Sequence, residues 1–269
     1  MSNKNTSRRY LGPKETKVIA RLSYEKATIV TAGQFDEYFD FSNVERAQII
    51  FRLKKKGILS TIKKGIYIFS PLESGPAGRN INEFLIASVL FPKKKYYVGY
   101  STMYNYYGLT DQIYQTIVIL NTRVQREKTI GGIQFKMIKV PSFRMYGLEK
   151  ISIGDAEVMV SDRERTLVDV VFFPDPVGGL KKAFDIIKNQ ISSKKINLQK
   201  FIEYVSIFPS VSTRKRIGIV LDKCGVADEE LFPLVKSIEG SSLLTLYNET
   251  SRRGRINRKW GLIENAASE

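Results

Sequence analysis

The side chains best suited to chemistry lie between residues 31 and 70, where basic and amide side chains gather. In the major groove of DNA, arginine pairs with guanine and asparagine or glutamine pairs with adenine, while lysine contacts phosphate. This segment therefore favours binding to double-stranded DNA. The candidate DNA-contacting residues are Ser42, Asn43, Arg46, Gln48, Arg52, Lys55, Lys63 and Lys64. Asn43 and Arg46 are the first candidates for base contact, because they lie near the start of the helix that would enter the groove.

Most of these side chains would be positioned by a helix from Asn43 to Lys56. Ser42 and Glu45 form a Ser-x-x-Glu capping box, which satisfies free amides at the start of a helix, and Gly57 is suited to end it. One face of this helix is expected to pack inward, with the polar candidates left outside. The expected inward face comprises Val44, Ala47, Ile49, Ile50, Phe51 and Leu53.

Two β-prone runs, residues 58–62 and 66–69, follow this helix. They are separated by Lys63, Lys64 and Gly65, and glycine in such a turn accepts a positive φ. The runs therefore predict a hairpin with two lysines at its tip. Lysines placed there would contact the sugar-phosphate backbone and add affinity that is independent of sequence and weakened by salt.

Two further helices, at about residues 14–26 and 31–38, are expected before the segment that carries the candidates. Three helices followed by a hairpin predict a winged helix-turn-helix. A basic amphipathic helix alone is more often a solvated face of a protein. The complete series of elements, together with the charge of the segment, favours DNA binding over that alternative.

The charge distribution supports the same interpretation. The chain has 43 Lys+Arg against 27 Asp+Glu, a formal net charge of +16, and residues 1–70 hold 14 basic and 6 acidic side chains. Such an excess attracts a polyanion. A second basic cluster surrounds Trp260 near the C-terminus, where a soluble tail is favoured over a phosphate-contacting arm.

The composition argues against an enzyme. The chain has no histidine and one cysteine, Cys224, which excludes Ser-His-Asp and Cys-His catalysis, histidine-containing zinc sites and a cage of several thiolates. No Gly-x-x-x-x-Gly-Lys-Ser/Thr run is present to bind nucleotide phosphates. We therefore expect no catalytic residue, no metal and no cofactor.

One pair of carboxylates keeps a nucleic-acid-modifying enzyme open as an alternative. Asp155 and Glu157 would lie on the same side of a strand, the arrangement that two-metal phosphoryl-transfer sites use to hold magnesium. A hairpin turn at Gly154 and Asp155 explains the same residues without catalysis. The hairpin is the favoured interpretation.

The whole chain predicts an α+β protein, with an N-terminal winged helix-turn-helix followed by a mixed α/β domain and a helical C-terminal subdomain. Its apolar runs are far shorter than the roughly 20 residues that span a bilayer, so no membrane partner is expected. The single cysteine excludes internal disulfides and leaves the cytoplasm as the default location. The expected divisions are a DNA-binding domain at 1–70, a linker at 71–80, an α/β domain at 81–190, a helical subdomain at 191–250 and a basic tail at 251–269.

Two segments beyond the N-terminal domain are more specific than the winged helix. The first is the turn Gly-Leu-Thr-Asp-Gln at residues 108–112, preceded by Tyr107. The second is Asp-Arg-Glu-Arg-Thr-Leu-Val-Asp at residues 162–169, followed by Pro174 and a Gly-Gly pair. Together with the winged helix, this pattern resembles the AbiEi family of antitoxins over about residues 15–190. It departs from the family at Tyr107, where members often carry histidine.

The resemblance implies the antitoxin of a type IV toxin–antitoxin, or abortive-infection, system against phage. Such a protein represses its own operon, and its functional partner is a nucleotidyltransferase toxin, with direct contact between the two left open. Operators of winged helices are usually paired half-sites, so we expect a monomer or weak dimer that binds DNA cooperatively. A transcription factor whose second domain senses a ligand is a further alternative.

Arg163, Arg165 and Asp169 match the family helix and are candidates for an antitoxin surface. A capped helix with an internal pair between Arg165 and Asp169, four residues apart, explains the same residues. The sequence favours neither interpretation.

Overall fold

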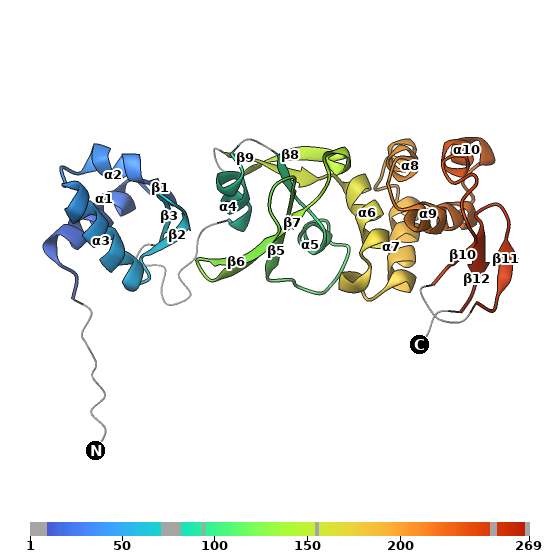
Figure 1. Ribbon diagram of the computed structural model, residues 1–269, viewed down its shortest axis with the longest axis horizontal. Coiled ribbons are helices and arrows are strands. Elements are labelled where there is room, and N and C mark those ends of the chain that lie inside the picture. The colour runs from blue at the N-terminus through green and yellow to red at the C-terminus, as the bar shows by residue number, and fades with distance from the viewer. Residues whose placement is uncertain (1–9, 71–81, 93–94, 154–155, 248–251, 267–269) are drawn as a thin grey trace, which may run out of the picture. The chain divides into compact units, whose positions relative to one another are not determined.

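The computed structural model describes residues 10–70, 82–92, 95–153, 156–247 and 252–266, and Figure 1 labels its helices and strands. The chain divides into two compact units. Unit 1 contains residues 1–92 and 128–134, and Unit 2 contains residues 93–127 and 135–269. Both units combine helices with strands, so the chain is an α+β protein, as expected. The expected linker at residues 71–80 lies outside the described residues.

Unit 1 packs helices against a small antiparallel sheet with the strand order β1-β3-β2. Its core includes Val18, Leu22, Phe35 and Leu53, which come from three different helices. The elements are α1 (Pro13–Tyr24), β1 (Ile29–Thr31), α2 (Ala32–Tyr38), α3 (Asn43–Lys55), β2 (Leu59–Lys63), β3 (Ile66–Phe69) and α4 (Glu83–Leu90).

Local sequence signals explain where α2 and α3 begin. Thr31 Oγ1 accepts a hydrogen bond from the amide of Gln34 at 3.2 Å, and Ser42 Oγ accepts one from the amide of Glu45 at 3.3 Å. The Gln34 and Glu45 side chains accept in return from the amides of Thr31 and Ser42. Both arrangements are capping boxes, so the box expected at Ser42 is confirmed.

Residues 128–134, which are distant in sequence, complete Unit 1. Lys128 Nζ donates a hydrogen bond to the carbonyl of Ile62 on β2 at 2.6 Å. Gly131 fits against Ile68 on β3, since a Cβ at this glycine would lie 3.1 Å from Ile68 Cδ1. Unit 1 is therefore larger than the expected N-terminal domain, because it also takes in α4 and this later segment.

Most of a mixed six-stranded sheet, with the order β6-β7-β5-β4-β9-β8, belongs to Unit 2. The central strand β4 is antiparallel to β5 and parallel to β9. The elements are β4 (Tyr96–Val98), α5 (Ser101–Tyr106), β5 (Thr116–Asn121), β6 (Arg126–Ile130), β7 (Ile133–Lys139), β8 (Leu148–Ile153) and β9 (Ala156–Ser161).

Helices and a three-stranded sheet form the rest of Unit 2. Their apolar faces share a core that includes Leu167, Ile187 and Phe201. None of the helices in the described ranges is long and apolar enough to cross a membrane. The elements are α6 (Arg163–Phe172), α7 (Leu180–Ser192), α8 (Leu198–Ser206), α9 (Val211–Lys223), α10 (Asp228–Lys236), β10 (Leu244–Thr245), β11 (Arg255–Asn257) and β12 (Leu262–Glu264).

The expectation of a soluble basic tail at the C-terminus is wrong for residues 252–266. Strands β11 and β12 pair there, and Trp260 between them is 0% exposed. The indole Nε1 donates to Asp222 at 3.1 Å. A Cβ at Gly218 of α9 would lie 2.0 Å from the indole ring, so the missing side chain of this glycine makes room for Trp260. The segment is thus part of the core of Unit 2.

Candidate nucleic-acid interface

One face of α3 is open to solvent and combines apolar with polar side chains. We call it the outward face and define it by Val44, Ala47, Gln48, Phe51 and Lys55, all of which are exposed. Each residue of this set is three or four residues from at least one other, so all of them lie on one side of the helix. Val44 and Phe51 are each 67% exposed, which leaves two apolar side chains at the surface.

The expected inward face is wrong for Val44, Ala47 and Phe51. Ile49 and Leu53 are buried as expected. A spacing of three residues drifts around a helix that has about 3.6 residues per turn, and from Val44 to Leu53 the drift amounts to half a turn. These two residues consequently lie on opposite sides of α3. A helical wheel centred on Leu53 identifies the exposed face from sequence alone.

The two first candidates for base contact, Asn43 and Arg46, are engaged with each other. Arg46 forms an ion pair with Asp36 of α2, and its Nη2 donates to the side-chain oxygen of Asn43 at 3.1 Å. The Arg46 side chain is 23% exposed. It lies on the side of α3 that faces α2, away from the outward face, and ties the two helices together.

The other candidates on α3 have different surroundings. Gln48 and Lys55 are exposed on the outward face. Arg52 is exposed beside that face, 4.0 Å from the carboxylate of Glu15 on α1. Ser42 caps the helix, and its hydroxyl donates to the Glu45 carboxylate at 2.8 Å. The structure therefore places Gln48 and Lys55, among the predicted residues, on the outward face.

Next to the outward face, a hollow of about 360 Å³ lies between the start of α1 and α3. Lys14 and Glu45 on its wall form an ion pair. Hydrogen bonds from the Lys14 ammonium, and from the amide and hydroxyl of Ser42, lower the pKa of Glu45 to about 2. The carboxylate thus joins the cap of α3 to the first helix.

Acid is expected to loosen the start of α3 through Glu45. The folded-state pKa of about 2 lies below the ordinary value of 4.5, so the stabilisation is complete above about pH 5 and is lost as the pH falls toward 2. Hydrogen exchange of the α3 amides between pH 5 and pH 2.5 measures this loss. Glu45→Gln should show weaker protection at pH 5 and a flatter profile, whereas Glu37→Gln, an exposed control on α2, should follow the wild type. Parallel profiles for all three proteins would contradict this assignment.

The tip of the β2–β3 hairpin carries Lys63 and Lys64 in different surroundings. Lys63 Nζ donates to the carbonyl of Val89 on α4 at 2.6 Å. Lys64 is exposed, and within the described ranges no hydrogen bond or ion pair holds its ammonium. Gly65 has a φ of +77°, and its carbonyl accepts from the amide of Ala32 at 2.8 Å. The tip is therefore fixed beside the start of α2 with Lys64 pointing into solvent.

The expected antitoxin surface is wrong for Arg165 and Asp169, which are both 0% exposed. Arg165 Nε lies 3.3 Å from Asp169 Oδ1. Its Nη1 also donates to the carbonyls of Arg144 and Tyr146, at 2.8 and 3.0 Å, and its Nη2 donates to the hydroxyl of Tyr97 at 3.0 Å. The internal-pair interpretation is therefore correct, because the sheet and the loop after β7 cover this face of α6.

Arg163, the third residue of the expected surface, is half-buried. Its guanidinium lies 4.7 Å from the centre of the Tyr107 ring and donates to the side chain of Gln190 at 3.1 Å. The Tyr107 hydroxyl donates to Glu149 at 2.6 Å. The tyrosine thus packs within Unit 2.

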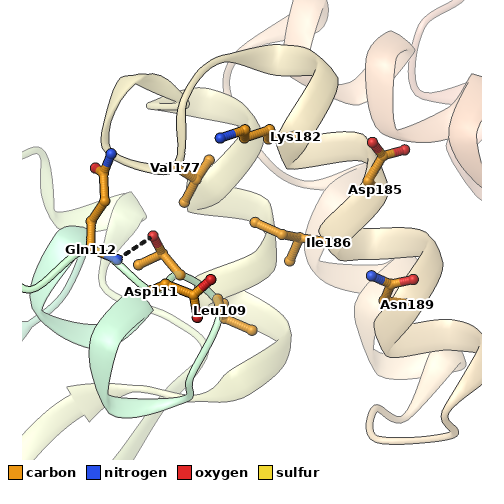
Figure 2. A pocket seen from close by; sticks show the side chains of 9 residues that line it. Leu109, Asp111, Gln112, Val177, Lys182, Asp185, Ile186 and Asn189 are labelled. Atoms are coloured by element: carbon orange, nitrogen blue, oxygen red, sulfur yellow. Dashed lines mark hydrogen bonds between the residues drawn. The ribbon is translucent and has the colours of Figure 1, made fainter.

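A second hollow, of about 300 Å³, lies in Unit 2 between the turn at residues 109–112 and α7. Figure 2 shows turn residues on one side and α7 residues on the other, with Val177 and Ile186 pointing into the space between them. Its charged side chains are all exposed at the rim: Asp111, Lys182 and Asp185.

The structure describes one residue of the carboxylate pair that was considered for catalysis. Asp155 lies outside the described residues. Glu157 forms an ion pair with Lys150 at 2.8 Å, across the β8–β9 hairpin. In the part of the chain that the structure describes, no group of three or more His, Cys, Asp or Glu side chains is placed to hold a metal ion.

Comparison with known proteins finds a similar fold but no match in sequence. Searches against protein-family models and curated proteins find no match. The chain is similar to the crystal structure of the RV2827C protein from Mycobacterium tuberculosis, with a TM-score of 0.65 and 14% sequence identity. The similarity covers 95% of this chain and 92% of that chain. At this identity the likeness concerns the fold alone.

Proposed function

We propose that Unit 1 is a winged helix-turn-helix that binds double-stranded DNA, and that the protein is a sequence-specific transcriptional repressor. The observation that carries this proposal is the outward face of α3, which is exposed along the helix and carries Gln48 and Lys55. The order α1, β1, α2, α3, β2 and β3 supports it, because α3 corresponds to the helix that enters the major groove and β2–β3 to the wing.

The distribution of cations supports the same proposal. Lys54 and Lys55 are exposed at the end of α3, and Lys64 is exposed at the hairpin tip. Cations in these two places suit the phosphates on either side of a groove that α3 occupies. Operators would be paired half-sites, which the protein binds cooperatively as a weak dimer.

Replacing Lys55 and Lys64 with alanine should weaken binding to all duplexes, because each lysine neutralises one phosphate and releases counterions. The slope of log K against log salt should fall by about 0.9 per lysine. Mobility-shift assays of the full chain on the DNA upstream of its gene, over a range of salt concentrations, measure both the affinity and the slope. Lys236→Ala, which removes an exposed lysine from α10, is the matched control. Equal slopes for the double variant and the control would contradict the proposal.

We further propose that the protein is the antitoxin of a type IV toxin–antitoxin system and counteracts a nucleotidyltransferase toxin. This part rests on the resemblance to AbiEi antitoxins. The toxin gene should overlap or follow the gene of this chain, and co-expression of the chain should restore growth that the toxin inhibits. The Lys55→Ala, Lys64→Ala double variant should lose repression of a reporter yet keep this rescue. Absence of rescue by the wild type would leave the repressor without an antitoxin role.

A ligand-sensing repressor is the second candidate, and the hollow beside α7 favours it. Asn189 lies at the edge of this hollow and is exposed, so Asn189→Trp would fill the space without disturbing the core. In a sensor, the variant should keep its DNA affinity in vitro but no longer respond to growth conditions in a reporter assay. An unchanged reporter response would favour the antitoxin.

A further inference from the structure

We propose that α3 reads A·T base pairs, through thymine methyl groups and one adenine, and does not read guanine. This inference rests on the proposed DNA binding by Unit 1. It concerns which base edges the outward face of α3 recognises.

The exposed apolar side chains of α3 have the chemistry that a thymine methyl group requires. Val44 and Phe51 are each 67% exposed, and Ala47 is exposed between them. In the major groove, the C5-methyl of thymine is the apolar feature that distinguishes a base pair, and side chains such as alanine and phenylalanine contact it. Exposure of two large apolar side chains to water costs free energy, which contact with methyl groups would recover.

The polar side chain on the same face has the chemistry that adenine requires. Gln48 is exposed between Val44 and Phe51, one turn from each. A glutamine side chain can donate to N7 and accept from the amino group of adenine in the major groove. From Val44 to Phe51 the helix rises about 10 Å, which corresponds to about three base pairs. The face therefore matches a short run of A·T pairs.

The two arginines of α3 lie away from the centre of the outward face, and Arg46 is held there by its partners. Guanine is recognised when an arginine or a lysine points at its O6 and N7. Lys55, the lysine of the outward face, is the last residue of α3, where we assign it to a phosphate. The Arg46 guanidinium is paired with Asp36 and bonded to Asn43, on the side of α3 that faces α2. Arg52 lies beside the outward face, 4.0 Å from Glu15 of α1. Neither fork points out from the centre of the outward face.

The charges around the outward face favour DNA over a protein as its occupant. Lys54, Lys55 and Arg52 border the face near the end of α3. The nearby carboxylate of Glu45 is paired with Lys14. Apolar side chains with a cationic rim are complementary to a polyanion that carries methyl groups in its groove.

The test uses the full chain to select the duplexes that it binds from a pool of random sequences. The duplexes are about 20 base pairs long, a length that holds two half-sites. Enriched duplexes are then remade with uracil in place of each thymine in turn, which removes only the methyl group. We expect A·T steps in each half-site and about fourfold weaker binding for each contacted thymine that loses its methyl, the size of effect that burial of one such group supports.

Exposed side chains allow variants that should fold normally. Val44→Ser and Phe51→Ser should make binding insensitive to uracil, and Gln48→Ala should weaken preference for adenine at one position by at least about fivefold. Arg46→Ala, which removes a link between α2 and α3 and is therefore checked for folding by circular dichroism, should leave the base preference unchanged. Lys64→Ala should weaken binding to all duplexes alike and so serves as the control.

Each other outcome overturns the inference in a recognisable way. If guanine is enriched and Arg46→Ala abolishes this enrichment, the protein still binds DNA but that arginine reads the bases. Salt-dependent binding without enrichment would leave a DNA-binding protein that does not read sequence through α3. Absence of any binding would overturn the proposed function as well, and self-association that Phe51→Ser abolishes would assign the outward face to a second copy of the chain.

Discussion

Replacement of Arg165 by alanine is expected to destabilise Unit 2 by about 3–5 kcal/mol, because it leaves a buried carboxylate without its nearest cation. Arg165 and Asp169 are both 0% exposed, and Asp169 Oδ2 has no hydrogen-bond partner among the residues that the structure describes. The guanidinium of Arg144, 3.6 Å from Asp169, would be the remaining cation. The variant would also lose the donors that satisfy two carbonyls and the Tyr97 hydroxyl.

Urea unfolding followed by fluorescence measures this effect, because Trp260, the single tryptophan of the chain, belongs to Unit 2. Arg163→Ala is the matched control, since Arg163 lies on the same helix but is half-buried, and it should cost about 1 kcal/mol. Equal midpoints for the two variants would overturn the structural role of the buried pair.

The deficit of Arg165→Ala should also depend on pH. Burial raises the pKa of the Asp169 carboxyl, and the two guanidiniums oppose that rise. Without Arg165 one of the opposing guanidiniums is lost and the pKa of Asp169 in the folded state rises further, so the stability of the variant increases more than that of the wild type as the pH falls. The difference in unfolding free energy from wild type should therefore narrow from pH 8 to pH 5.

Trp260→Ala is expected to cost about 3–5 kcal/mol, because it removes a fully buried aromatic side chain from the core of Unit 2. Far-UV circular dichroism in urea follows this variant, which lacks the fluorophore. Ile256→Ala, on the neighbouring strand β11, is the control because Ile256 is 56% exposed. Gly218→Ala probes the same contact from the other side and should cost about 1–3 kcal/mol by overpacking. Wild-type stability for Trp260→Ala would mean that the C-terminal segment does not contribute to the core.

Features that depend on residues close in sequence could be predicted. The capping box of Ser42 and Glu45 and the turn at Gly65 are local, since their hydrogen bonds and positive φ involve neighbouring residues. The positions of α3 and of the β2–β3 hairpin can be predicted from these local signals. So does the exposure of Gln48, Lys55 and Lys64.

Features that depend on distant residues could not be predicted from the same signals. The burial of Arg165 requires carbonyls of the loop after β7 and a hydroxyl from β4. The burial of Trp260 requires a glycine on α9, which no spacing near the tryptophan reveals. The position of Arg46 near the start of α3 predicts a base contact, but its partner, Asp36, lies on another helix, which local spacing does not reveal. In each case a charged or aromatic side chain found its partner through tertiary packing.

The completion of Unit 1 by residues 128–134 has a consequence for how the protein is made. Translation delivers α1 to β3 first, yet the segment that packs on Ile62 and Ile68 is synthesised only after β4 and β5. A nascent or prematurely terminated chain therefore has its third helix without the support of the finished unit. In the repressor that we propose, fragments that end before residue 128 should bind DNA weakly, so repression would begin only after residues 128–134 have left the ribosome.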